Sequence, residues 1–289
     1  VENGQVNVPD SSFISNAELV RDGYDLVLET PQGTLVVENY FLMEPSPDIV
    51  SPDGLTLSPQ LVNSFVQSTP EYAQMGSLSD VSPVGSVQEI SGEATVTRTD
   101  GSIEPVTIGT PIFQGDVVET DSEGAVNIVF IDETSFAISE NARLAIDEYV
   151  FDPVTESGSS NFSVMRGVFV FTSGLIGRDD PDDVEIETPV GSIGIRGTTI
   201  AGDVDAGEIT VIEGAIVLRA HNGTEMTLAE QFETAKFDMA SGEIVSMGKL
   251  SANDVGTKFA AIGKVAPVFA NSLGQEAGTD TLPGEESAG

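Results

Sequence analysis

The sequence contains no cysteine and no tryptophan, and it has only four tyrosines and one histidine. Without cysteine, the chain can form no disulfide, no thiolate zinc site and no cysteine nucleophile. Glycoside hydrolysis requires a pair of carboxylates, and the 47 acidic residues supply such pairs at every spacing. Sugar-binding sites, however, usually contain aromatic side chains on which the sugar stacks, and this sequence has few of them. No apolar run approaches the roughly 20 residues of a membrane-spanning helix. We therefore expect a protein that is not an enzyme and has no membrane span in this chain.

Basic residues are also scarce, with 11 lysines and arginines against 47 acids and a formal net charge of -36. Nucleic acid is therefore excluded as a partner, because phosphate binding needs clustered basic side chains. A strongly acidic surface is typical of proteins bathed in salt or calcium, which screen the self-repulsion. This favours an extracellular or cell-surface location on a bacterium. The chain begins at Val1 with no signal stretch after it, so we expect any export signal to lie outside it.

The segment 84–240 is predicted to be an all-β domain of many short strands, arranged as a sandwich or a solenoid. Short β-branched runs such as "GAVNIVFID", "NFSVMRGVFVF" and "AIVLRA" alternate with Gly, Asp and Asn turns. An internal repeat supports this prediction, because Gly92 to Gly109 resembles Gly214 to Glu230. Each copy has an arginine before a "DG" or "NG" pair, which is a strong hairpin signal.

The flanking segments have different patterns. Residues 1–43 predict a small N-terminal β-hairpin domain. Residues 44–83 predict a linker with one short helix near 59–67. Ser58 is expected to cap this helix, and Pro59 to occupy its first position. Residues 241–270 predict a C-terminal amphipathic helix that begins at a Ser251 capping box and buries one face. The tail 271–289 is acidic and is expected to be flexible. The buried face is predicted to consist of Val255, Phe259, Ile262 and Ala266.

The stretch "TPVGSIGIRGTTIAGDV" has a glycine at every third position, at Gly191, Gly194 and Gly197. This spacing matches neither the dinucleotide fingerprint nor a Walker loop, and no helix pattern follows it. Glycines within strands usually mark kinks or close backbone approach, which is the interpretation we favour here. His221 lies in the turn "RAHNGT" with no serine motif beside it, so we expect a surface turn residue.

Four aspartates surround Pro181 in "RDDPDDVEIE", namely Asp179, Asp180, Asp182 and Asp183. Oxygen ligands at this density could hold calcium, which takes six to eight of them. The stretch lacks the spaced aspartates and glycine of an EF-hand loop, so a solvated acidic turn is the competing interpretation. Calcium is the candidate metal, and no other cofactor is predicted.

Two motifs resemble those of FecR-type domains: "GDVVET", followed by short apolar strands, and "TPVGSIGIRGT" further on. The resemblance covers about residues 84–220 and implies an all-β domain. The name of the family comes from periplasmic regulators that pass a signal from an outer-membrane transporter to an inner-membrane sigma-factor system. The chain is more similar to FecR-like domains near the N-terminus of large, type I-secreted adhesins and biofilm matrix proteins. In those proteins, "GYDLVLETPQGTLVVENYF" also has a counterpart, a β prefix domain like that of biofilm-associated proteins.

The leading functional hypothesis is therefore a non-catalytic extracellular protein that adheres or assembles at the bacterial surface. It would act as a filament subunit or matrix component, with calcium bridging its carboxylates, and its partners would be further copies of itself or other matrix proteins. The alternative is a periplasmic FecR-type signal-transduction domain that binds an outer-membrane transporter. A carbohydrate-binding or hydrolysing module is the third hypothesis, for which the sequence offers no site.

Overall fold

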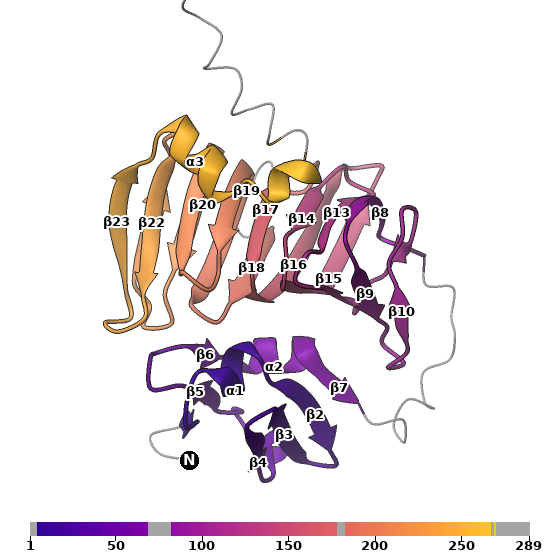
Figure 1. Cartoon of the computed structure of the whole chain (residues 1–289), viewed down its shortest axis with the longest axis vertical. Helices are drawn as coiled ribbons and strands as arrows, with labels where there is room; N and C mark the ends of the chain where they lie inside the picture. The colour runs from indigo at the N-terminus through magenta and orange to yellow at the C-terminus, as the bar shows by residue number, and fades with distance from the viewer. Residues whose placement is uncertain (1–4, 69–81, 178–182, 267–268, 270–289) are drawn as a thin grey trace, which may run out of the picture.

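The computed structural model describes residues 5–68, 82–177, 183–266 and 269 (Figure 1). The fold is all-β with short helices, as the sequence predicts. A small N-terminal unit lies below a large folded sheet, and a C-terminal helix lies above it (Figure 1). No helix in the described part of the chain is both long enough and apolar enough to cross a bilayer.

The N-terminal unit contains two small sheets and three short helical segments. Its strands are β1 (Gln5–Asn7), β2 (Glu18–Asp22), β3 (Asp25–Thr30), β4 (Gly33–Val37), β5 (Asp48–Val50), β6 (Thr56–Leu57) and β7 (Val66–Ser68). Its helices are α1 (Ser12–Ser15), the 3-10 turn η1 (Tyr40–Leu42) and α2 (Pro59–Phe65). The predicted hairpin is β3–β4, in which Leu26 and Leu28 are paired with Val37 and Leu35. One sheet has the order β4-β3-β2-β7 and the other β1-β5-β6.

Helix α2 begins where the sequence predicts. The Ser58 hydroxyl accepts a 3.2 Å hydrogen bond from the backbone N–H of Leu61, and Pro59 occupies the first turn. The apolar side of α2, with Leu61, Val62 and Phe65, is buried in the core of the N-terminal unit. The helix therefore packs as part of this unit, and its polar side faces the large sheet.

The large sheet has 16 strands. In chain order they are β8 (Gly85–Ser91), β9 (Ala94–Thr97), β10 (Ile103–Pro105), β11 (Pro111–Ile112), β12 (Val117–Thr120), β13 (Ala125–Phe130), β14 (Ser135–Ile138), β15 (Arg143–Asp152), β16 (Ser157–Arg166), β17 (Val168–Thr172), β18 (Val184–Thr188), β19 (Gly191–Asp203), β20 (Glu208–Arg219), β21 (Glu225–Leu228), β22 (Glu233–Asp238) and β23 (Glu243–Lys249). All neighbouring pairs are antiparallel except β16 and β18.

The sheet folds back on itself along the hairpin β19–β20. The first half of β19 is paired with β18, and its second half is paired with β17. On its other edge, β19 is paired with β20 along both halves. The register shifts between Arg196 and Thr199, where the hairpin bends. Two limbs result: a first limb of β10, β9, β12, β15, β16, β18 and β21, and a second limb of β11, β8, β13, β14, β17, β22 and β23. Because the limbs face each other, the arrangement is that of a sandwich rather than a solenoid.

The main core lies between the two limbs, because every second residue of each strand points inward. An aromatic cluster occupies its centre. Phe162 of the first limb lies 5.2 Å, between ring centres, from both Phe130 and Phe136 of the second limb. Phe136 also contacts Phe169 and Phe171, and all these rings are buried. The five rings thus join the two limbs.

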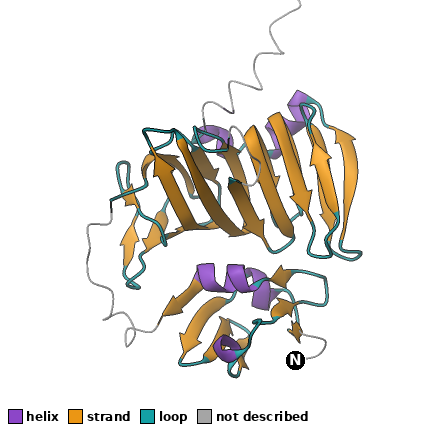
Figure 2. Ribbon diagram, turned by 180° about the vertical axis from the view of Figure 1, so that it is seen from behind, coloured by secondary structure: helices purple, strands orange, loops and turns teal. Residues whose placement is uncertain are grey.

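The outer face of each limb is also partly covered. On the first limb, Val117, Ala145 and Met165 pack against the N-terminal unit. Figures 1 and 2 show a helix of that unit lying against the sheet. On the second limb, Val170 and Ala201 belong to a cluster beneath the C-terminal helix.

The C-terminal helix buries the face that its sequence predicts. It consists of α3 (Ala252–Lys258) and the 3-10 turn η3 (Ile262–Lys264). The Ser251 hydroxyl caps α3 by accepting a 3.1 Å hydrogen bond from the N–H of Asp254. All four residues predicted for the apolar face are buried: Val255, Phe259, Ile262 and Ala266. The predicted flexible tail lies outside the described residues.

The spaced glycines of the sequence all lie in strand β19. A side chain at Gly191 would meet the carbonyl oxygen of Arg219 at 2.6 Å, and Gly197 has a φ of 55° at the bend. These positions need glycine for close approach and for positive φ. The stretch is a bent strand and not a phosphate loop.

The internal repeat corresponds to two hairpins at opposite ends of the first limb. In one, between β9 and β10, Arg98 forms a 2.8 Å ion pair with Glu104. In the other, between β20 and β21, Arg219 lies 3.1 Å from Glu225. Each arginine thus pairs across its turn with a glutamate six positions later.

Candidate functional site

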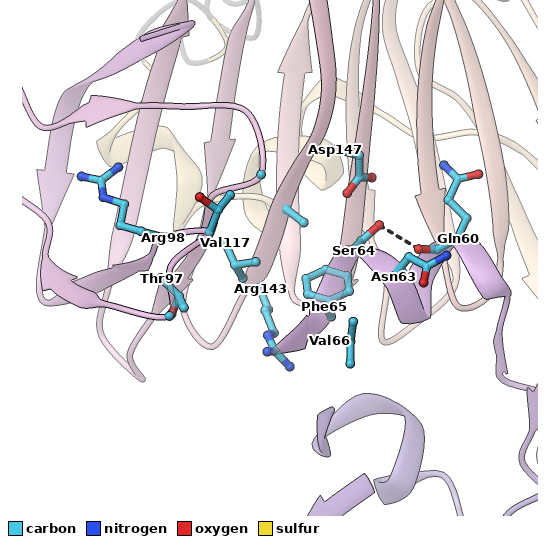
Figure 3. A pocket seen from close by; sticks show the side chains of 14 residues that line it. Gln60, Asn63, Ser64, Phe65, Val66, Thr97, Arg98, Val117, Arg143 and Asp147 are labelled. Atoms are coloured by element: carbon cyan, nitrogen blue, oxygen red, sulfur yellow. Dashed lines mark hydrogen bonds between the residues drawn. The ribbon is translucent and has the colours of Figure 1, made fainter. Parts of the chain in front are cut away.

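A cavity of about 670 Å³ lies between helix α2 and the outer face of the first limb (Figure 3). Its floor is one row of small side chains. Thr97 on β9 is paired with Val117 on β12, and Val117 is paired with Ala145 on β15. Laterally paired residues point to the same face of a sheet, and here this face is turned away from the main core. Because none of the three side chains is larger than valine, space remains beneath the helix.

The roof of the cavity is the polar side of helix α2 and the strand that follows it. Gln60, Asn63 and Ser64 line the cavity from the helix, and Phe65 and Val66 from its C-terminal end. Figure 3 shows these side chains lying opposite the strands of the first limb. The cavity therefore has amide and hydroxyl groups on one side and one aromatic ring near its end.

Arg143 closes one end of the cavity and is only 4% exposed. Its Nη1 donates a 3.3 Å hydrogen bond to the carbonyl oxygen of Ala17. Its Nε lies 3.3 Å from Oε1 of Glu119, and its guanidinium carbon lies 5.0 Å from the centre of the Phe65 ring. Burial lowers the pKa of Arg143. Through these contacts the arginine links the N-terminal unit to the first limb, and its guanidinium already has partners within the protein.

Asp147 lies at the other end of the cavity. The register of β15 against β16 shifts between Ile146 and Glu148, so Asp147 occupies a bulge. Its Oδ2 accepts a 2.6 Å hydrogen bond from the hydroxyl of Ser163. Burial raises the pKa of Asp147, while hydrogen bonds from Ser163 and Ser64 oppose the rise. Among the described residues, no lysine or arginine forms an ion pair with this carboxylate.

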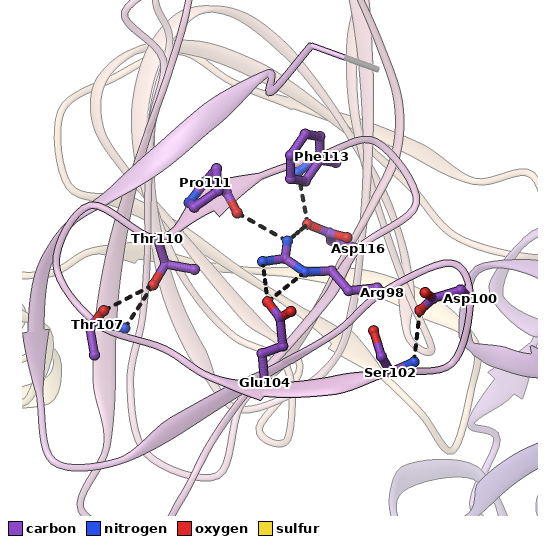
Figure 4. Close-up of polar contacts among 9 residues, drawn as sticks. All are labelled: Arg98, Asp100, Ser102, Glu104, Thr107, Thr110, Pro111, Phe113 and Asp116. Atoms are coloured by element: carbon purple, nitrogen blue, oxygen red, sulfur yellow. Dashed lines mark hydrogen bonds and ion pairs between the residues drawn. The ribbon is translucent and has the colours of Figure 1, made fainter. Parts of the chain in front are cut away.

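Arg98 forms the side wall and is fully engaged (Figure 4). Its guanidinium donates to the carbonyl oxygen of Pro111 at 3.0 Å, to Oδ2 of Asp116 at 2.5 Å and to Oε2 of Glu104 at 2.8 Å. Asp116 also accepts a 2.8 Å hydrogen bond from the N–H of Phe113. Burial raises the pKa of Asp116, which the hydrogen bond from Phe113 and the charge of Arg98 counteract. The network holds the β9–β10 hairpin in place beside the cavity.

The calcium candidates of the sequence fall mostly outside the described residues, since Asp179, Asp180 and Asp182 lie in the interval 178–182. Asp183 is described, and its carbonyl oxygen accepts a 2.9 Å hydrogen bond from the N–H of Ser160. Within the described residues, no group of three or more acidic, histidine or cysteine side chains is placed to hold a metal. The calcium site therefore stays a prediction.

His221 lies in the turn between β20 and β21, as predicted, with its Nε2 3.3 Å from the carbonyl oxygen of Pro189. It does not line the cavity. The sequence analysis did not single out Asp147, although one signal was present. In "RLAIDEYVF", two adjacent acids interrupt the alternation of a buried strand, which is a typical mark of a bulge.

Comparison with protein families places a FecR protein domain at residues 116–217. The match runs from the start of β12 into β20 and lies inside the segment 84–240 that the sequence predicts to be FecR-like. It therefore covers the middle of both limbs. No match was found among curated proteins.

Solved structures give more distant likenesses. Two crystal structures described as a "putative anti-sigma factor" from Parabacteroides distasonis each share 12% identity with the chain, with a TM-score of 0.39. They align with 48% and 49% of this chain and with 62% and 64% of their own. A "cell surface anchoring domain" shares 30% identity over 22% of this chain and 83% of its own, with a TM-score of 0.21. The chain thus spans less than two thirds of the two anti-sigma factor structures.

The family match corrects the leading functional hypothesis. It supports a FecR domain, whereas it does not support cell adhesion, a biofilm matrix or a filament. The predicted extracellular location and the predicted assembly with itself or with matrix proteins were wrong for the same reason. Composition misled here, because an acidic surface restricts the range of partners without identifying a function. The match supports the alternative hypothesis instead.

Proposed function

We propose that this chain is a signal-transduction domain of the FecR type, which works by binding a protein partner rather than by catalysis. The observation that carries the proposal is the family match over residues 116–217. The matched segment supplies the strands on both sides of the main core and the shared hairpin β19–β20. In this proposal the domain is periplasmic, and its partner is an outer-membrane transporter or a component of a sigma-factor system.

The outer face of the first limb is the surface best suited to a partner. The N-terminal unit covers only part of it, and the remainder carries the cavity between β9, β12, β15 and α2. The wall of that cavity is held rigidly by the ion pair of Arg98 with the buried Asp116. A rigid, partly polar hollow on a sheet face can select a partner without moving, as preformed binding sites do.

The test is transcriptional, because a signalling domain changes gene expression and an adhesive protein does not do so directly. Residues 84–249 would be deleted in frame from the chromosomal gene of the bacterium that encodes the chain, and transcripts would be sequenced. We expect a defined set of transcripts to change and a plasmid copy of the intact gene to restore them. A copy carrying Val154→Ala is the control, since Val154 is 89% exposed on a turn remote from the core. An unchanged transcript profile across several growth conditions would reject the proposal.

A further inference from the structure

We propose that the cavity over the first limb binds an extended segment of a partner protein and holds a lysine or arginine of that segment at Asp147. This inference rests on the proposed function, which it deepens by naming the surface and the chemistry of the partner. It depends on three independent features of the site: an uncompensated carboxylate, an unpaired strand edge and the sign of the surrounding charge.

The first feature is the uncompensated carboxylate of Asp147. Among the described residues, the hydrogen-bond donors near this carboxylate are hydroxyl groups: Ser163 donates at 2.6 Å, and Ser64 lies close enough to act on the pKa of Asp147. Figure 3 shows the carboxylate pointing toward Ser64 at the roof of the cavity. A partly buried charge without a counter-ion is costly, and a cation brought by a ligand would remove that cost.

The two basic side chains that line the cavity, Arg143 and Arg98, do not form ion pairs with Asp147. Arg143 is four residues away on the same strand, about 13 Å at the rise of an extended chain. It is engaged with Glu119 and Ala17. Arg98 is engaged with Glu104 and Asp116. Neither basic side chain that lines the cavity is therefore free to compensate Asp147, and a bound ligand would have to supply the positive charge.

The second feature is strand β7 at the mouth of the cavity. It is the last strand of the order β4-β3-β2-β7, and within the part of the chain that the structure describes it is paired only with β2, in parallel. Its first residue, Val66, lines the cavity. An unpaired edge offers backbone N–H and C=O groups to an incoming extended segment, which is the basis of recognition by strand addition. The volume of about 670 Å³ suits a few residues of such a segment rather than a folded domain.

The third feature is charge. The chain carries a formal net charge of -36, so a basic segment is attracted to its surface and an acidic one is repelled. The cavity adds specificity to this general attraction, because Gly115 and Ala145 leave the space beside Asp147 free of bulky side chains. A flexible lysine or arginine side chain can therefore reach the carboxylate along the floor.

The experiment begins with two synthetic peptides as probes and uses the full chain. The first probe is the blocked peptide Thr-Val-Lys-Val-Thr, and the second has norleucine in place of lysine. Binding is followed by nitrogen-proton correlation spectra at pH 8. We expect the lysine peptide to shift the amide signals of Val66, Ala145 and Asp147 with a dissociation constant near or below about 1 mM, and the norleucine peptide to bind roughly tenfold more weakly.

Two variants decide the role of the carboxylate. Asp147→Asn keeps the shape of the side chain, and we expect it to remove the tenfold preference for lysine. Glu243→Gln is the matched control, since it changes the net charge equally on the exposed start of β23 in the second limb, and it should leave the preference intact. Equal binding of both peptides, or no shifts at about 5 mM, would overturn the proposal.

A third probe, n-butylamine, separates a partner segment from a small amine. If butylamine alone reproduced the shifts at the same concentration, the strand-addition part of the proposal would be overturned. None of these outcomes depends on the transcriptional test, so the peptide-binding proposal can fail while the signalling function stands.

Discussion

The hydroxyl of Ser58 donates a 2.8 Å hydrogen bond to the carboxyl group of Glu187, and so joins the start of helix α2 to the outer face of β18. Glu187 is 9% exposed and forms no ion pair within the described residues. Burial is the main reason that its pKa rises to about 7, with further contributions from Glu185, Asp147 and Asp48. The contact between the N-terminal unit and the first limb is therefore sensitive to pH.

The first prediction concerns this pH dependence. A carboxyl group whose pKa is raised in the folded state stabilises the fold fully at pH values below its unfolded pKa of 4.5. The contribution is lost as the pH rises through about 7, because the folded group must then ionise without a counter-ion. For Glu187, the rise of the pKa from 4.5 to about 7 corresponds to a total loss of about 3 kcal/mol of unfolding free energy. Urea unfolding at pH 5 and pH 8 measures most of this loss, because part of it has already occurred at pH 5.

Glu187→Gln supplies the comparison, because glutamine is neutral at every pH. We expect the difference in unfolding free energy between pH 5 and pH 8 to shrink by about 2.5 kcal/mol in this variant. The control Glu243→Gln, on an exposed strand, should keep the pH dependence of the parent. If both variants kept it, Glu187 would not be the group responsible.

A second prediction compares the two carboxylates that share Arg98. Asp116 is 1% exposed, whereas the Glu104 side chain is 54% exposed. Asp116→Asn leaves the arginine without its buried counter-ion and should cost about 3 kcal/mol of unfolding free energy. Glu104→Gln should cost less than about 1 kcal/mol, since water screens an exposed pair. Equal losses in urea unfolding would show that burial does not decide the strength of this network.

A third prediction addresses the aromatic cluster. Phe136 is fully buried and contacts rings from both limbs. Phe136→Ala should lower the free energy of unfolding by about 4 kcal/mol, the sum of lost transfer energy and the cavity left behind. Val154→Ala, at a side chain that is 89% exposed, should change it by less than about 0.5 kcal/mol. A small effect at Phe136 would mean that the rings do not join the limbs.

A fourth prediction concerns the C-terminal helix. Phe259 is 1% exposed and belongs to the apolar cluster over the second limb. Phe259→Ala should detach α3 and speed amide hydrogen exchange in α3 and β17, while leaving the N-terminal unit unchanged. Lys264→Ala is the control, since this side chain is exposed on the turn η3. Faster exchange throughout the chain would instead indicate global destabilisation.

The sequence predicts local features of this fold well. The cap at Ser58, the hairpin β3–β4 and the buried face of the C-terminal helix follow from short-range patterns, because each depends on residues a few positions apart. The choice between sandwich and solenoid did not follow, since it depends on how β19 pairs with both β17 and β18. Strand order is a long-range property that periodicity does not encode.

The candidate site was harder to predict for the same reason. Its two charged ends, Arg143 and Asp147, are near in sequence, but its roof comes from helix α2, roughly 80 residues earlier. Only folding places Ser64 opposite Asp147. The bulge at Asp147 left a visible trace in the sequence, whereas nothing local marks the cavity itself.

The shared hairpin β19–β20 has a consequence for how the molecule can be divided. The family match ends at residue 217, inside β20, and begins at residue 116, after β8 and β9. A fragment cut at those borders would expose the edges of β12 and β13 and would lose the strands that pair with both halves of β20. Since a single hairpin gives each limb two of its strands, neither limb can be excised, swapped or inherited without the other. We therefore expect the smallest portion of this chain that folds without unpaired inner edges to be the complete sandwich, from β8 to β23.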